Sequence, residues 1–229
     1  MMAANSRDVR AVVFDLDGTL IDSAPDLQAA LNSVLEEKGR RRLDLEEVKH
    51  MIGDGVLKLL ERAFAATGVP VPGEELPVIA CRFLDFYEGH DADFTRTYEG
   101  VPETLARLRD DGIVMGVCTN KPFQATEDVL RKLDLRDYFV AVLGGDSLPG
   151  GIRKPDPRHI GATLKAMNAD PATAVVVGDH PNDIASARAA RVPVVAVSYG
   201  YSRKPIRELK PNAVIDAFAD LPAALRQLA

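Results

Sequence analysis

The chain has 229 residues, of which 46% are hydrophobic and 27% are charged, and its formal net charge is −6. This length allows one large domain or one domain that carries an insert, and the composition is that of a soluble globular protein. The acidic balance excludes general nucleic-acid binding, which normally leaves a basic footprint. We find neither an apolar segment long enough to span a bilayer nor a signal peptide, so we expect a cytoplasmic protein with no membrane partner.

Apolar runs and helix-start signals predict the elements in chain order. A buried strand at 12–14 ends in the polar stretch 15–19, and the pattern from there to about residue 94 is helical. The predicted helices of that stretch cover 23–37, a segment from 44, 56–67 and 76–88. Strands then alternate with helices: strands at 114–118, 140–143, 174–177, 194–197 and 214–215, and helices at 102–108, 122–133, 157–167, 183–190 and from 221.

This alternation predicts an α/β fold with a parallel sheet that has helices on both faces. The helical stretch interrupts the unit after its first strand, so it is an insert and not a terminal domain. We therefore predict a Rossmann-like core formed by residues 1–20 and 95–229, and an inserted all-helical domain at 21–94.

Smaller signals lead to three local predictions. Ser23 is expected to cap the first inserted helix, with Asp26 as the acid of its first turn. The basic run 38–42 is followed by acids and is predicted to be a solvated loop between helices. Cys81 and Cys118 stand in apolar surroundings and are expected to be buried free thiols.

Two carboxylates, Asp15 and Asp17, follow the first strand directly. Two ionised acids so close together repel each other unless a cation lies between them or one of them holds a proton. The pattern therefore indicates a Mg²⁺ site at the end of a strand, although Asp and Gly are also ordinary turn residues.

Polar residues also follow the later strands. Thr119 and Asn120 end the strand at 114–118, Asp179 ends the strand at 174–177 with Asp183 four residues further on, and Lys154 precedes the start of a helix. Ligands bind beyond the carboxyl ends of parallel strands, so these groups are expected to meet at one sheet edge. Taken alone, Thr119 and Asp183 could simply cap helices, and Lys154 could be a surface lysine.

At these positions the sequence resembles the haloacid dehalogenase superfamily of phosphotransferases. The resemblance rests on Asp15-Leu16-Asp17-Gly18-Thr19 as the first motif, Thr119 as the second, Lys154 as the third, and Gly178-Asp179 with Asp183 as the fourth. The insert resembles the C1-type cap of that superfamily. Within the superfamily the likeness is strongest to phosphoglycolate phosphatases, on stretches that include 21–26, 53–55, 119–122, 144–146, 154–157 and 198–201.

The resemblance implies a role for each group. Asp15 would be the nucleophile, Asp17 the general acid and base, and Thr119 and Lys154 would bind the phosphoryl group. Backbone amides near Leu16, Gly18 and Asn120 would do likewise. Mg²⁺ would be held by Asp15, by the backbone carbonyl of Asp17 and by Asp179, with Asp183 close by.

The Gly53-Asp54-Gly55 break in the insert is the candidate for a loop that reaches the substrate, with a plain turn as the alternative. There are three departures from the pattern of the superfamily. They are His180 in place of a common Ser, Arg191 in place of a common Gly, and a lengthened loop at 150–152.

The sequence thus predicts a Mg²⁺-dependent phosphatase that acts on a small phosphorylated metabolite, with 2-phosphoglycolate as the first candidate. A sugar phosphate, a nucleotide or pyrophosphate remains open as the substrate, and so does a phosphosugar mutase reaction. A regulatory binding module on the same fold is the non-enzyme alternative. The oligomeric state is left open between monomer and homodimer.

Overall fold

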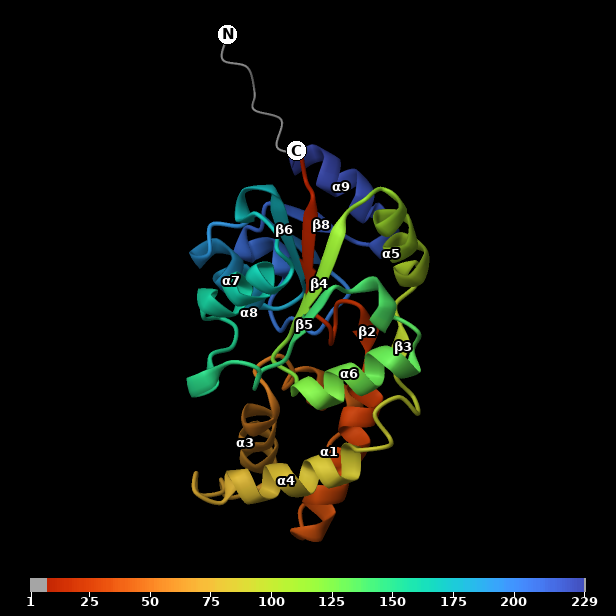
Figure 1. Cartoon of the computed structure of the whole chain (residues 1–229). Helices are drawn as coiled ribbons and strands as arrows, with labels where there is room; N and C mark the ends of the chain where they lie inside the picture. The colour runs from red at the N-terminus through yellow and green to blue at the C-terminus, as the bar shows by residue number, and fades with distance from the viewer. Residues whose placement is uncertain (1–7, 229) are drawn as a thin grey trace.

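The computed structural model describes residues 8–228. Its strands form a six-stranded sheet and a two-stranded ribbon (Figure 1). The strands are β1 Ala11–Phe14, β2 Ile21–Asp22, β3 Arg96–Thr97, β4 Val114–Cys118, β5 Ala141–Leu143, β6 Ala174–Gly178, β7 Val194–Val197 and β8 Ala213–Ile215. The helices are α1 Ala24–Glu37, α2 Leu45–Lys49, α3 Val56–Thr67, α4 Leu76–Tyr87, α5 Val101–Asp110, α6 Phe123–Lys132, α7 Pro157–Ala166, α8 Pro181–Ala189 and α9 Leu221–Leu228.

The large sheet has the strand order β5-β4-β1-β6-β7-β8, and every pair in it is parallel. All four residues of β1 are buried, because the strand lies in the middle of the sheet and has helices on both sides. Val12 and Phe14 pack into one apolar cluster and Ala11 and Val13 into another, as the alternation of side chains along a strand requires. The predicted α/β fold is confirmed.

Each face of the sheet is covered by its own helices. Leu105 of α5, Leu130 of α6 and Leu225 of α9 belong to the cluster on one face. Ile160 of α7 and Ile184 of α8 belong to the cluster on the other face. The two sets lie on opposite sides of the strands in Figure 1. This leaves the carboxyl ends of the strands as the open edge of the core.

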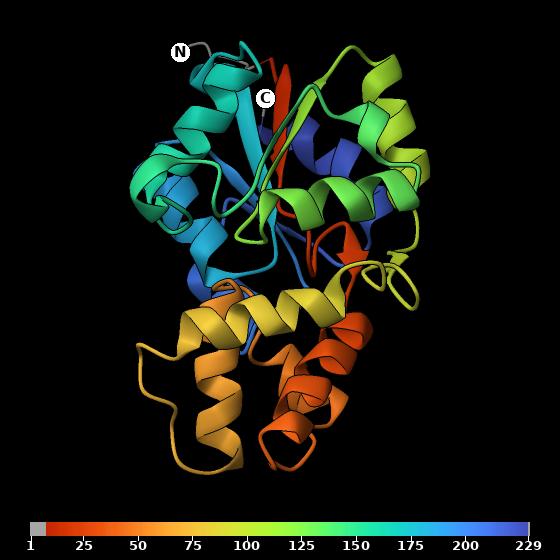
Figure 2. The same cartoon turned by 60° about the horizontal axis from the view of Figure 1, so that its bottom comes forward.

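Helices α1–α4, here called the helical insert, lie beyond that edge (Figures 1 and 2). They enclose an apolar cluster of their own, in which Leu31, Leu60, Phe64 and Phe83 are almost completely buried. Figure 2 shows α4 running across the side of the insert that faces the core. The insert therefore places one helix directly over the strand ends.

The chain passes between the core and the insert through the antiparallel ribbon β2–β3, in which Ile21 pairs with Thr97 and Asp22 with Arg96. The prediction that the chain is helical from residue 21 is wrong for these two residues, because a two-residue strand is too short to show an alternating pattern. The side chain of Asp26 accepts hydrogen bonds from the backbone amides of Phe94 and Thr95. It thus fastens the returning strand to α1.

Two of the local predictions need correction. Ser23 precedes α1, but its side chain makes no cap hydrogen bond; its hydroxyl donates to Asp17 instead. Cys118 is buried, whereas Cys81 is exposed. Ile79, Phe83 and Tyr87 fill the buried face of α4, and the helical period places Cys81 on the opposite face.

The basic run 38–42 lies in the loop between α1 and α2, as predicted. Arg41 and Arg42 form exposed ion pairs with Glu47 and Glu36. Within residues 8–228, every helix is too short or too polar to cross a lipid bilayer.

Candidate active site

The predicted site residues meet at the open edge of the sheet. Asp15 follows β1, Thr119 and Asn120 follow β4, and Asp179 follows β6. Because β1 lies between β4 and β6, the ends of these three strands are neighbours. The predicted convergence is confirmed.

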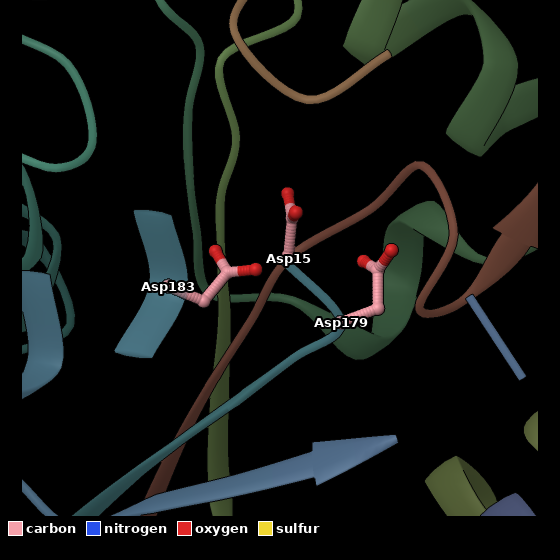
Figure 3. A group of neighbouring side chains, drawn as sticks. All are labelled: Asp15, Asp179 and Asp183. Carbon is pink, nitrogen blue, oxygen red and sulfur yellow. The ribbon is translucent and has the colours of Figure 1, made fainter. Parts of the chain in front are cut away.

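Three carboxylates, those of Asp15, Asp179 and Asp183, form the centre of the site (Figure 3). One oxygen from each lies within 4.8 Å of the others, and all three residues are buried. Burial and the nearby Asp183 raise the pKa of Asp15 to about 6, against the opposing effect of Lys154. Burial, Asp15 and Asp183 raise the pKa of Asp179 well above its usual value. The cluster therefore needs positive charge in order to be fully ionised.

Lys154 supplies part of that charge. Its ammonium lies 2.8 Å from Asp15 Oδ1 and 2.6 Å from Asp183 Oδ1, and the residue is only 3% exposed. Burial alone would lower the pKa of Lys154, but the two carboxylates outweigh it and raise the pKa. Three carboxylates and one ammonium leave two negative charges, and hard oxygen ligands suit Mg²⁺. The residues present therefore fit a single divalent cation.

Two neighbours hold Asp179 in place. The Thr19 hydroxyl donates to its Oδ1 at 2.8 Å, and the Tyr201 amide donates to its Oδ2 at 2.7 Å. Gly18 passes so close that an added Cβ would lie 2.4 Å from Asp179 Oδ2. The Gly18 amide itself donates to the carbonyl of Ile21, and phosphoryl binding by amides near Gly18 stays a prediction. The absence of a side chain at Gly18 permits the close approach to Asp179.

Asp183 takes part in capping α8, as its sequence position allowed, and it also contacts Lys154. Its Oδ2 accepts the His180 amide in a capping box at the start of α8, and its Oδ1 accepts a hydrogen bond from Lys154. The Leu16 amide bonds to Asp15 Oδ1 at 2.7 Å and so helps to orient that carboxylate. The longer loop at 150–152 has not moved Lys154 away from Asp15.

Asp17 has different partners from those of the carboxylate cluster. Its Oδ1 accepts hydrogen bonds from the Ser23 hydroxyl at 2.6 Å and from the Lys121 ammonium at 3.3 Å. Lys121 also donates to the hydroxyl of Tyr87 on α4, at 2.8 Å. Burial alone would lower the pKa of Lys121, but Asp17 and Tyr87 outweigh it and raise the pKa, so this buried group stays charged.

Thr119 does not cap α6, because the residue at that helix start is Pro122; its hydroxyl instead accepts the Lys121 amide. The Asn120 side chain donates to the carbonyls of Gly53 and Lys154, at 3.0 and 2.9 Å. Asn120 therefore joins the insert to the loop that carries Lys154.

The loop 53–55 reaches the site, but its three residues do different things. Gly53 and Gly55 line the cavity in front of Asp15, whereas Asp54 is not among the described residues that line it. The Asp54 carboxylate accepts a hydrogen bond from Asn182 and pairs with Arg62, and its part in substrate binding stays a prediction. A Cβ on Gly53 would lie 2.5 Å from the ring of His180, which shows how closely the loop packs on the core.

The cavity itself lies between the core and the insert. Its core wall carries the polar residues Asp15, Asp17, Thr119, Asn120 and Lys121, together with Pro122 and Ala125. Its insert wall is mainly apolar: Leu27, Ile52, Val56, Leu59, Phe83 and Leu84, joined by Tyr87. The polar side chains of the cavity therefore lie mainly on its core side.

Residues 12–197 match the family model of the haloacid dehalogenase-like hydrolases. The chain belongs to the haloacid dehalogenase-like hydrolase family. Proteins named phosphoglycolate phosphatase are among its relatives. The one from Caulobacter vibrioides is 42% identical over 213 residues, which cover 93% of this chain and 89% of the relative. The one from Rhodospirillum rubrum is 43% identical over 216 residues, with the same two coverages.

A solved structure from Haemophilus somnus, described as a predicted phosphoglycolate phosphatase, aligns with a TM-score of 0.87 and 32% identity. The alignment covers 94% of this chain and 97% of that one. These matches confirm the predicted family, the likeness to phosphoglycolate phosphatases and the class of enzyme, a phosphatase.

Several residues that the structure places at the site of this family member were not predicted from the sequence to have a role there. They are Thr19, Ser23, Tyr87, Lys121, Asn182 and Tyr201. Lys121 carried a usable signal, because it is a lysine directly behind the polar end of a strand. Tyr87 carried none, since its spacing on α4 is that of an ordinary core residue.

Proposed function

We propose that the chain is a Mg²⁺-dependent phosphomonoester hydrolase that forms an aspartyl-phosphate on Asp15, with 2-phosphoglycolate as its first candidate substrate. The observation that carries this proposal is the Asp15 carboxylate itself. It is buried, it is paired with Lys154 at 2.8 Å, and it lines the same cavity as a second acid, Asp17. The names of the relatives support the choice of substrate.

Charge repulsion is the main obstacle to this reaction. A carboxylate that meets a phosphate dianion faces about 8 kcal/mol of repulsion, at about 4 kcal/mol per charge pair at 4 Å and an effective dielectric near 20. Lys154 offsets part of it. Bound Mg²⁺, held by Asp15, Asp179 and the backbone carbonyl of Asp17 with Asp183 nearby, would supply the remaining positive charge.

In the first step, an Asp15 oxygen forms a bond to phosphorus while the bond from phosphorus to the ester oxygen breaks. Asp17, in its protonated form, gives its proton to the departing oxygen. In the second step, Asp17 takes a proton from water as the water attacks phosphorus, and the bond from phosphorus to Asp15 breaks. Thr119 and the amide of Asn120 would bind the phosphoryl oxygens.

Asp17 also separates this reaction from dehalogenation, because the resemblance implies that the dehalogenases of the superfamily lack an acid at this position. The charged groups that a phosphatase needs, Asp15, Asp17, Lys154 and Asp179, are all present and all lie at one edge of the sheet. This speaks against a regulatory module, in which we expect at least one of them to be lost.

A phosphate-release screen with Mg²⁺ tests the proposal. The panel contains 2-phosphoglycolate, sugar phosphates, nucleotides and pyrophosphate, and each compound is also assayed with excess chelator. We expect release of inorganic phosphate to be fastest from 2-phosphoglycolate and to stop with the chelator. Conversion of a sugar phosphate into its isomer without phosphate release would show a mutase, and weak, equal activity on the whole panel would refute the substrate.

A further inference from the structure

Lys121 is a buried cation that the reaction described above does not use. It follows the polar end of β4 and is 6% exposed, and it lines the cavity together with Asp15 and Asp17. It is the one lysine or arginine among the described residues that line this cavity. A buried ammonium is costly unless it has partners, so its position calls for an explanation.

Within the described part of the chain, Lys121 uses only two of the three N–H donors of its ammonium. An ammonium has three donors. Lys121 uses one for Asp17 and one for the Tyr87 hydroxyl, and within residues 8–228 no acceptor takes the third. The insert wall of the cavity is mainly apolar and offers no second cation to an anionic ligand. Among the described residues that line the cavity, Lys121 is therefore the cation that can pair with an anionic group on a ligand.

The chemistry of the proposed reaction tells us where such a group would lie. Asp17 protonates the ester oxygen of the leaving group, so that oxygen lies next to the Asp17 carboxylate. Lys121 is 3.3 Å from the same carboxylate. In 2-phosphoglycolate a single methylene separates the ester oxygen from the carboxylate. Once Asp17 has given its proton to the ester oxygen it is ionised, and a carboxylate at that distance is then repelled unless a cation is present.

We infer that Lys121 determines specificity by binding a carboxylate on the leaving group, one carbon away from the ester oxygen. The inference rests on the proposed function and adds the reason for its substrate class. Tyr87 has a supporting part: it belongs to α4 of the insert and bonds to Lys121 from there. The carboxylate site is therefore completed by a residue of the insert.

A matched pair of substrates tests the inference. 2-Phosphoglycolate carries a carboxylate, and 2-hydroxyethyl phosphate carries a neutral hydroxymethyl group in its place. We expect the wild type to have a much higher kcat/KM for the first. Lys121→Met should lower kcat/KM for 2-phosphoglycolate by about 100-fold, since a buried charge pair loses one partner. The same variant should lower kcat/KM for 2-hydroxyethyl phosphate by less than about fivefold. Most of the loss for 2-phosphoglycolate should be a higher KM. Lys121→Arg should restore part of the preference for 2-phosphoglycolate over 2-hydroxyethyl phosphate.

Lys132→Met is the matched control. Lys132 also pairs with a buried carboxylate, that of Asp91, but it is not among the residues that line this cavity. We expect the substrate preference of this variant to equal that of the wild type.

The outcomes separate this inference from the proposed function. If Lys121→Met lowers kcat/KM equally for both substrates, Lys121 only positions Asp17, and the inference is wrong. If the wild type hydrolyses both substrates equally well, the inference is wrong although the enzyme remains a phosphatase; this comparison needs no variant to fold. If the wild type releases phosphate from no ester at all, the proposed function itself fails.

Discussion

The carboxylate cluster and the Asp17–Lys121 pair lie in one site, but different regions of the molecule hold them. The cluster of Asp15, Asp179 and Asp183 has its partners in the core, where Lys154, Thr19 and the Tyr201 amide bind it. The Asp17–Lys121 pair has partners on the path to the insert: Ser23 at the start of α1 and Tyr87 on α4.

This difference suggests a division of work. Because the direct partners of the cluster belong to the core, we expect its geometry, and with it the attack on phosphorus, to depend less on the insert. Lys121, the partner of Asp17, can bond to Tyr87 only when α4 lies over the strand ends, as it does in Figure 2. Proton transfer and recognition of the leaving group should therefore depend on the insert.

The largest effects should come from the two acids themselves. Asp15→Asn removes the nucleophile, and we expect phosphate release to fall by at least about 10⁴-fold. Asp17→Asn removes proton transfer and should cost about 10²–10⁴-fold, while the protein still becomes phosphorylated. Steady-state assays and intact-protein mass after rapid quenching measure the two effects. Near-normal hydrolysis by Asp15→Asn would show that Asp15 is not the nucleophile, and the division between the cluster and the Asp17–Lys121 pair would then fail.

Lys154→Met should be next in size. Loss of a charge that faces the phosphoryl group should lower kcat by about 10²–10³-fold for every substrate, unlike Lys121→Met. In the metal-free protein it also leaves Asp15 and Asp183 buried without their cation, which should lower the free energy of unfolding by about 3–5 kcal/mol. Lys165→Met, an exposed lysine in the last turn of α7, is the control and should change neither quantity. If Lys154→Met lowered kcat for one substrate only, this would contradict the proposed division of work between the cluster and the Asp17–Lys121 pair.

The carboxylate cluster is the core half of the site, and the Asp17–Lys121 pair is the Asp17 half. Mg²⁺ should stabilise only the core half. At 100 times its Kd the ion should add about 2.7 kcal/mol to the free energy of unfolding. Asp179→Asn should abolish this gain and Asp17→Asn should retain it, because the Asp17 side chain is outside the cluster. Thermal unfolding with and without Mg²⁺ measures the gain. Equal loss of the gain in both variants would show that the two halves are not separate.

The same experiment has a pH dependence with a definite sign. The pKa of Asp15 is about 6 in the fold and 3.8 in the reference state. The folded metal-free protein thus holds more protons between these values, and its stability falls as the pH rises through about 6. Bound Mg²⁺ favours the ionised form, so its stabilising effect should be larger at pH 7.5 than at pH 5. A gain that does not depend on pH would contradict the raised pKa.

The sequence predicted the core half of the site well. Asp15, Thr119 and Asp179 each follow an apolar run, and the rules of parallel sheets then place them together. The Asp17 half was harder, because its partners come from elements far apart in the chain. Tyr87 is separated from Lys121 by 34 positions, and its spacing on α4 signals only burial.

Ser23, Asp54 and Gly18 each make a contact that could not be predicted from the sequence. Each residue has an ordinary local role in its sequence context: a helix cap, a loop acid and an amide donor. In the fold each is engaged in a contact that the sequence pattern does not show, with Asp17, with Asn182 and with the carbonyl of Ile21. Sequence patterns report local preference, whereas these contacts depend on how the insert and the loops pack.

Gly53→Ala should disturb the contact between the insert and the core without contacting Asp15 or Asp17. The added Cβ would lie 2.5 Å from the His180 ring, and the residue has a φ of +114°, so the loop has to shift. We expect kcat/KM to fall by about tenfold, which is about 1.4 kcal/mol. Gly39→Ala is the control, because its φ of +64° is also positive but nothing lies within 4 Å of the new Cβ. Recovery of activity in Gly53→Ala/His180→Ala would locate the effect in this contact, and activity unchanged by Gly53→Ala would show that the loop is not part of the site.

The smallest predicted effect concerns His159, which is buried in α7 on the core side of the molecule. Burial and then the charge of Lys154 lower the pKa of His159 to about 4, from 6.5. The unfolded chain therefore binds a proton more readily, and stability is lost as the pH falls from 6.5 towards 4. Between pH 7.5 and 5.5 this loss should be about 1 kcal/mol. His159→Leu should remove it, as urea unfolding with saturating Mg²⁺ at the two pH values would show. His159 lies in the core, away from Lys121, so the substrate preference should not change in this variant. If the stability of wild type and variant depended equally on pH, His159 would not be held neutral by the fold.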